Sequence, residues 1–211
     1  MSKAKDIMSK TKDIIIIGSA TVVGIIATIL ALKYTKKVLK KMENLILEKS
    51  GKYIGELEKK GNQGFYNAEL EKKIKATGWK LGEPYCAYFV KAMYIDAHPE
   101  LKTKLNRILT GGTQYTWSLA TKDKTGTVET IKKASVGDIA IWQTYKNGKG
   151  KGSGHAGIVK EVFPDKFITI EANTGSSGGR EGDGIYIKNR TYGFNVSNGL
   201  RLKGFIHLLK K

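Results

Sequence analysis

The sequence predicts an α+β domain, with helices packed on an antiparallel sheet, preceded by a single transmembrane helix. Three observations predict this order. Residues 14–32 read IIIIGSATVVGIIATILAL and carry no charge. Helical patterns follow between residues 33 and 98, and short alternating stretches with turn signals follow residue 136. Helices followed by a meander of strands are typical of α+β folds.

The composition is that of a folded, strongly basic chain with one cysteine. Its 211 residues hold 37 Lys and Arg against 19 Asp and Glu, a formal net charge of +18. This charge favours an anionic cell-wall polymer or an anionic lipid surface as partner. Zinc-finger spacing, an aromatic RNA-binding signature and a basic heptad helix are all absent from the sequence, so we expect no nucleic-acid partner. Cys86 has no second cysteine to pair with, so an intramolecular disulfide is excluded.

The N-terminal part divides into a basic tail (1–13), a transmembrane anchor in the lipid bilayer (14–32) and a charged helical stalk (33–60). The uncharged segment just spans a hydrocarbon core of about 30 Å at about 1.5 Å per residue. A buried core helix would show a polar face, and a cleaved signal peptide would have a shorter apolar region and an A-x-A site. Small residues at i, i+4 spacing permit helix–helix self-association in the membrane. Lysines flank both ends, so the topology stays open.

Residues 61–211 form the predicted α+β domain. One helix is expected over 67–76, and a second begins at Pro84, which suits a first turn, and ends at His98 before Pro99. Residues 100–135 look irregular, and the glycine-rich stretch 147–154 looks like a loop. Strands are expected over the following ranges: 137–144, 155–163, 167–174, 184–190 and 204–209.

Cys86 and His155 are the candidate catalytic pair. Cys86 is expected in the first helical turn, where the positive end of the helix favours a thiolate and free N–H groups can stabilise an oxyanion. His155 opens a strand after a mobile, glycine-rich stretch. Glu171 and Asn173 stand two apart on the next strand, so both project from one face and can orient the imidazole.

Each candidate also has an ordinary structural interpretation. A lone cysteine is usually a small buried apolar residue, and Glu171 with Asn173 is commonly a solvated strand end. His98 precedes a proline at a helix end, which is typical of a surface residue. His207 lies in an amphipathic terminal strand, which is typical of a structural residue. From spacing alone the catalytic and the structural interpretations are about equally supported.

Four motifs in one order change that balance: GEPYCAYFV (82–90), SVGDIAIWQ (135–143), GSGHAGIV (152–159) and ITIEANTG (168–175). Together they resemble the CHAP family, the cysteine, histidine-dependent amidohydrolases/peptidases, over roughly residues 60–209. The resemblance implies a papain-like α+β fold and a catalytic domain over 61–211. It also implies Cys86 as nucleophile, His155 as base, and Glu171 and Asn173 as orienting residues.

The sequence departs from the family pattern in places. Tyr85 stands where Trp is frequent, and Ser135–Val136 replaces a pair that ends in Pro. A glutamine positioned as an extra oxyanion donor is not apparent. Some members carry a calcium loop before the cysteine, but residues 61–85 contain no Asp, so we expect neither a metal nor a cofactor.

The resemblance implies bacterial peptidoglycan as substrate, cut as an N-acetylmuramoyl-L-alanine amidase or as an endopeptidase through a thioester. We expect a protein anchored in the host inner membrane or a virion membrane, with its catalytic domain outside the cytoplasm. The settings that fit are bacteriophage lysis by an endolysin, local wall opening by a virion, and conjugation or secretion, and of these we favour a phage origin. A non-enzymatic, membrane-anchored virion or envelope protein is the alternative, and a holin-like membrane-permeabilising protein is a third.

Overall fold

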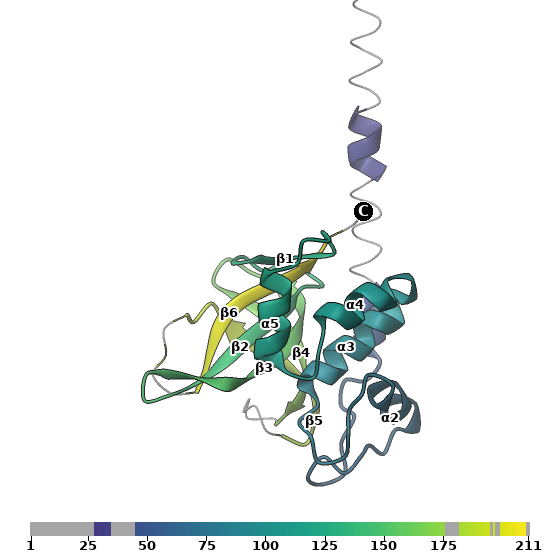
Figure 1. The fold of residues 1–211 in the computed structure, drawn as a ribbon, viewed down its shortest axis with the longest axis vertical. Helices are drawn as coiled ribbons and strands as arrows, with labels where there is room; N and C mark the ends of the chain where they lie inside the picture. The colour runs from purple at the N-terminus through teal and green to yellow at the C-terminus, as the bar shows by residue number, and fades with distance from the viewer. Residues whose placement is uncertain (1–27, 35–44, 176–181, 195, 197–198, 210–211) are drawn as a thin grey trace, which may run out of the picture. The chain divides into compact units, whose positions relative to one another are not determined.

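The computed structural model of the chain describes residues 28–34, 45–175, 182–194, 196 and 199–209. The chain divides into two compact units, Met1–Met42 and Glu43–Lys211. The described part of the first unit, 28–34, is helical. The second unit contains the sheet, the helices labelled in Figure 1 and every candidate site residue.

The transmembrane helix expected over 14–32 is not supported. Within the described ranges, no helix is long and apolar enough to cross a membrane. Residues 28–34, which include the end of the expected span, are helical. Residues 14–27 of the expected span lie outside the described residues.

The second unit is built on a six-stranded sheet of antiparallel pairs, which confirms the predicted α+β class. Its order is β1-β6-β2-β3-β4-β5 (Figure 1). The strands are β1 (Val128–Ile131), β2 (Ile139–Lys146), β3 (Lys149–Val162), β4 (Lys166–Thr174), β5 (Gly184–Thr191) and β6 (Gly199–Leu208). The last strand in the chain therefore lies between the first two.

A tight hairpin joins β2 to β3 where a loop was expected. Lys146 pairs with Lys149, which leaves Asn147 and Gly148 as a two-residue turn. Both have positive φ, 52° and 70°, as a type I′ turn requires. The turn lets the glycine-rich stretch continue as strand and leads directly to the candidate base on β3.

Helices cover one face of the sheet. They are α2 (Ala68–Lys75), α3 (Cys86–Ala97), the 3-10 helix η1 (Pro99–Leu101), α4 (Lys102–Ile108) and α5 (Thr113–Thr121). α3 and α5 pack on β3, and α3 contributes Phe89, Val90 and Met93 to the main core. A second apolar cluster, which includes Trp142, Phe167 and Phe205, is separate from this core. Both clusters draw on β2 and β4, so these strands are largely buried.

Helices α4 and α5 and strand β1 fall in the range expected to be irregular. α4 has 7 residues and α5 has 9, which gives little room for a periodic pattern. α5 is also rich in Thr, which has modest helix propensity. Packing compensates, because Ala120 is buried and the Thr116 hydroxyl accepts a hydrogen bond from the Thr110 N–H at 2.9 Å.

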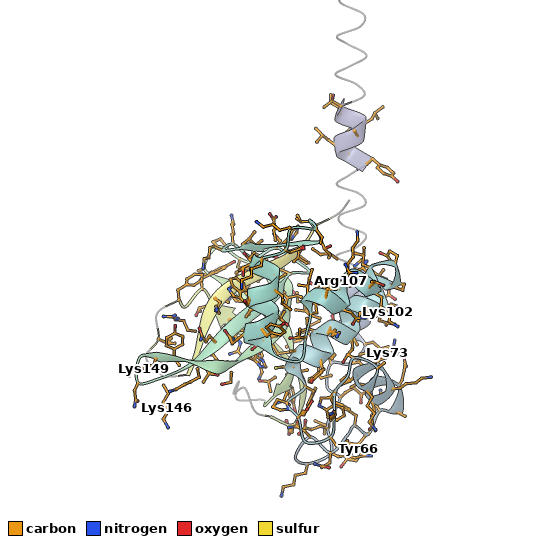
Figure 2. The ribbon with its side chains drawn as sticks, viewed as in Figure 1. Tyr66, Lys73, Lys102, Arg107, Lys146 and Lys149 are labelled. Atoms are coloured by element: carbon orange, nitrogen blue, oxygen red, sulfur yellow. The ribbon has the colours of Figure 1, made fainter. Side chains whose placement is uncertain are left out.

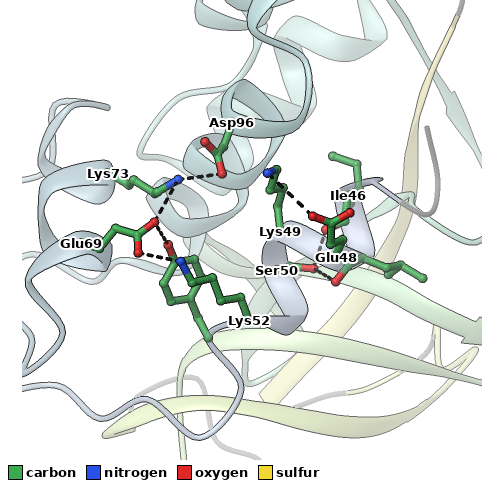
Figure 3. Close-up of polar contacts among 10 residues, drawn as sticks. Ile46, Glu48, Lys49, Ser50, Lys52, Glu69, Lys73 and Asp96 are labelled. Atoms are coloured by element: carbon green, nitrogen blue, oxygen red, sulfur yellow. Dashed lines mark hydrogen bonds and ion pairs between the residues drawn. The ribbon is translucent and has the colours of Figure 1, made fainter. Parts of the chain in front are cut away.

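The second unit also includes residues 43–60, which we assigned to the stalk. Residues 45–51 are helical, and Ile46 and Tyr53 are buried in the main core. Figure 3 shows how polar contacts tie this segment to the domain: Lys52 pairs with Glu69 of α2 at 2.6 Å. The Tyr53 hydroxyl donates to the same carboxylate at 3.1 Å. The folded unit therefore begins before residue 61.

Candidate active site

Cys86 is the first residue of α3, and its side chain is only 6% exposed. Pro84, expected in the first turn, lies before the N-cap residue Tyr85. The first helical hydrogen bond runs from the Phe89 N–H to the Tyr85 carbonyl. The three residues between them therefore have N–H groups without an intrahelical acceptor, and these groups create positive potential around the thiol.

His155, on β3, is fully buried and interacts with the Cys86 thiol. Burial alone would raise the pKa of Cys86, but the charge and hydrogen bond of the imidazole, with backbone N–H groups of Ala156 and Ala87, lower it below its ordinary value. Burial would lower the pKa of His155, but Cys86 and Glu171 raise it to about 9. The pair is therefore stabilised as thiolate and imidazolium.

Glu171, on β4, holds the other side of the imidazole. Its Oε2 lies 2.9 Å from Nε2 of His155, and both side chains are fully buried. Because an ionised carboxylate only accepts, Nε2 carries a proton. Nδ1 has no hydrogen-bonding nitrogen or oxygen partner within the described ranges, so it is the nitrogen that remains for the thiol. Burial would raise the pKa of Glu171, but Arg190 and His155 lower it to about 2.

Sequence reasoning missed Arg190, which supports this carboxylate from β5. Its Nε donates to Oε1 of Glu171 at 2.7 Å, and its Nη2 donates to Oε2. The Thr169 hydroxyl donates to Oε1 at 2.5 Å. The guanidinium also lies over the Trp142 ring, 5.3 Å from its centroid, and that ring lies 5.8 Å from the His155 ring. The sequence signal was a lone arginine at the end of an alternating strand, a pattern that surface strands also show.

Asn173 has a different position from the one expected. Its φ is 57°, and the register of β4 against β5 shifts between Ala172 and Thr174. The strand therefore does not keep its alternation from Glu171 to Asn173. The Asn173 Oδ1 accepts a hydrogen bond from the Tyr85 N–H at 3.1 Å. Glu171 is thus hydrogen-bonded to the imidazole, whereas Asn173 joins the end of β4 to the start of α3.

A cleft opens in front of Cys86. It is lined by residues of three segments, 83–88, 111–113 and 152–154, and has a volume of about 250 Å³. Two of these walls are mostly glycine. A Cβ at Gly154 would lie 2.0 Å from the Trp142 carbonyl oxygen, whereas a Cβ at Gly152 would meet nothing within 4 Å. The residue before His155 must therefore be glycine for the chain to pass so close to β2.

Glutamine 114 is the glutamine nearest the cleft, but it supports the scaffold. Its Nε2 donates to the Trp142 carbonyl at 2.8 Å and also contacts the Thr113 hydroxyl at 3.3 Å. The donors suited to an oxyanion are instead the backbone N–H groups at the start of α3. The other two histidines lie elsewhere. His207 pairs with Asp138 at 2.6 Å. His98, expected at the surface, is instead buried, with 3% of its area exposed.

No group of three or more His, Cys, Asp or Glu suited to a metal ion occurs in the part of the chain that the structure describes. The expectation of no metal and no cofactor stays a prediction. The catalytic roles of Cys86, His155, Glu171 and Asn173 also stay predictions. What the structure adds is their geometry, in which the first three form one buried chain of contacts.

Comparison with known protein families identifies the central part of this unit. Residues 76–173 match the model of the CHAP domain. The matched segment contains Cys86, His155, Glu171 and Asn173, while Arg190 lies beyond it. A comparison with curated proteins finds no match.

Proposed function

We propose, from the CHAP domain that residues 76–173 form, that this protein is a cysteine-dependent peptidoglycan amidase or endopeptidase. At the family level, the CHAP domain implies a peptidoglycan hydrolase of the amidase/peptidase type. The finer assignment rests on one observation, the buried chain from Cys86 through His155 to Glu171 beside an open cleft. A thiolate, a protonated imidazole and a fixed carboxylate are the groups that cysteine-dependent acyl transfer needs.

In the proposed reaction, the Cys86 thiolate attacks the carbonyl carbon of an amide in the peptide part of peptidoglycan. The negative charge on the carbonyl oxygen is stabilised by backbone N–H groups at the start of α3. His155 then gives its proton to the leaving nitrogen as the C–N bond breaks, which leaves a thioester. His155 takes a proton from water, the resulting hydroxide cleaves the thioester, and the thiol is restored as a thiolate–imidazolium pair.

The alternative is a non-enzymatic wall-binding protein with a retained hydrolase fold. A binding role gives no reason to bury an ion pair, because desolvating two charges is costly unless the arrangement serves another purpose. Here the carboxylate, the imidazole and the thiol are all nearly or fully removed from water. This favours the enzyme, and we place its action outside the cytoplasm, where the substrate lies. Digestion of the domain by protease added to intact spheroplasts that express the chain tests that location.

The test of activity uses the full chain and a Cys86→Ala variant on purified peptidoglycan from several bacteria. We expect clearing of turbidity by the wild type and none by the variant. Circular dichroism of both proteins verifies that they are folded. Mass spectrometry of the new amino groups identifies the bond: a free L-alanine amine indicates an amidase, and other new amines indicate an endopeptidase. Clearing by neither protein, with both folded, would support the binding role instead.

A further inference from the structure

Glu83 is the one Asp, Glu, Lys or Arg among the described residues that line the cleft. It stands three positions before Cys86 and is held firmly. Its N–H donates to the Lys80 carbonyl at 3.1 Å, and its own carbonyl accepts from the Trp79 indole at 2.7 Å. The Tyr88 hydroxyl donates to its Oε2 at 2.9 Å. The carboxylate therefore has a fixed place in the wall beside the nucleophile.

The second carboxylate oxygen of Glu83 is open. Both side-chain hydrogen bonds that Glu83 accepts end on Oε2, and no ion pair joins Glu83 to a cation of the described chain. Glu69, Glu71 and Glu171, in contrast, each pair with Lys or Arg. A half-buried carboxylate with one free oxygen, facing an open cleft, is suited to receive a cation from outside.

Glu83 has no part in the chain of contacts from Cys86 through His155 to Glu171. The pKa of Cys86 depends on burial, on His155 and on the backbone N–H groups of Ala156 and Ala87, and Glu83 is not among these causes. Its charge is therefore available for another step. Binding the substrate is the step that its position in the cleft wall allows.

We propose that Glu83 binds a primary ammonium group of the substrate peptide, close to the amide that Cys86 attacks. This inference rests on the proposed function. Peptidoglycan peptides carry such groups on diamino acids and on free amino termini. The cleft suits a peptide of this kind, because Gly111, Gly112, Gly152 and Gly154 leave two of its walls with few side chains. An ammonium group can then reach the open Oε1 while Tyr88 keeps Oε2 in place.

The test compares native walls with the same walls after N-acetylation, which removes the ammonium charge and leaves the scissile amides intact. General electrostatics predicts faster cleavage of acetylated walls, because they are more anionic and the protein carries +18. Basic side chains such as Lys146 and Lys149 flank the turn of the β2–β3 hairpin (Figure 2). The Glu83 site predicts the opposite, a fall in kcat/KM of about two- to fivefold, which is the range that a half-exposed ion pair provides.

A Glu83→Gln variant of the full chain should show a similar loss on native walls and no further loss on acetylated walls. Asp165→Asn is the matched control, because it removes one negative charge from the exposed β3–β4 turn, and it should respond to acetylation as the wild type does. If acetylation of the walls leaves the wild-type rate unchanged or raises it, that result alone overturns the inference. Equal sensitivity of Glu83→Gln and wild type to acetylation would overturn it too. If the wild type cleaves neither wall, the proposed function itself is wrong.

Discussion

Arg190 and Glu171 form a two-point ion pair next to the candidate nucleophile, with Nε donating to Oε1 at 2.7 Å and Nη2 donating to Oε2. The carboxylate is fully buried, whereas the arginine side chain is 17% exposed. The guanidinium therefore satisfies a charge that has no access to water. Because the same carboxylate holds Nε2 of His155, Arg190 positions the imidazole through Glu171.

Replacing Arg190 by Gln should strongly destabilise the fold. The substitution removes the two-point partner of the buried Glu171 carboxylate and leaves the His155 imidazolium as its remaining cation. Breaking one buried pair costs up to roughly 3–5 kcal/mol. Urea denaturation at neutral pH measures the change in the free energy of unfolding. Arg190→Lys should recover part of the loss, because it keeps the charge but not the two-point geometry.

The difference in stability between the wild type and Arg190→Gln should depend on pH. In the wild type the pKa of Glu171 is about 2, below its ordinary value of 4.5, so its stabilising effect is present above about pH 4.5 and is lost as the pH falls toward 2. In Arg190→Gln the carboxyl can be protonated at higher pH. The stability gap between the two proteins should therefore narrow in acid, and a gap that widens in acid would contradict this account.

Glu171→Gln should lower kcat about 100-fold or more while the protein remains folded. The amide cannot stabilise the imidazolium, so the pKa of His155 should fall from its value of about 9. In the variant, His155 therefore loses at a lower pH the proton that it has to donate to the leaving nitrogen. The alkaline limb of the kcat/KM profile should lie near pH 9 in the wild type and move to lower pH in the variant. If the alkaline limb stays at the same pH in the variant, a group other than His155 controls it.

Substitutions of Asn173 should separate its side chain from its backbone conformation. Asn173→Ala loses the hydrogen bond to the Tyr85 N–H. It also places at φ 57° a residue that adopts positive φ less readily than Asn does, so we expect a loss of about 1–3 kcal/mol. Asn173→Gly tolerates that φ and should lose less, while Asn173→Asp keeps an acceptor. Thermal unfolding of the three variants gives the order. Equal losses for Ala and Gly would mean that the backbone conformation contributes little.

Gly154→Ala and Gly152→Ala form a matched pair on one strand. A methyl group at position 154 would lie 2.0 Å from the Trp142 carbonyl oxygen, whereas one at position 152 would have open space. We expect Gly154→Ala to destabilise the protein by about 1–3 kcal/mol or to shift β3, and so to move His155 and lower activity. Gly152→Ala should change stability by less than about 0.5 kcal/mol. Urea denaturation and wall clearing measure both effects.

Much of the fold could be predicted from local patterns. Alternating stretches and turn signals located the strands from β2 onward, and the proline before Cys86 located the start of α3 to within two residues. The short helices α4 and α5 could not be predicted, because packing against other elements, α3 and α5 for α4 and the sheet for α5, stabilises them more than their own sequences do. The hydropathy of residues 14–32 also led to a membrane span that the described helices do not support.

The residues of the candidate site could be predicted from the sequence, but the contacts between them could not. A helix start, a strand start and a polar pair on the next strand indicated Cys86, His155, Glu171 and Asn173. The division of roles between Glu171 and Asn173 depends on a register shift in β4, which no alternation pattern shows. Arg190 could not be predicted because its partner lies across strands, 19 positions away in sequence.

The position of β6 in the sheet also determines when the site can form during synthesis on the ribosome. β1 pairs with β6, and β2 has β6 as one of its two neighbours. Until residues 199–208 have emerged, Trp142 lacks its cross-strand partner Leu202 and the apolar cluster that includes Phe205. The Trp142 ring is the one that packs beside His155. A chain in which β6 has not yet paired therefore lacks part of the packing around the His155 ring. The surroundings of the candidate site are complete only when the last strand has taken its place between β1 and β2.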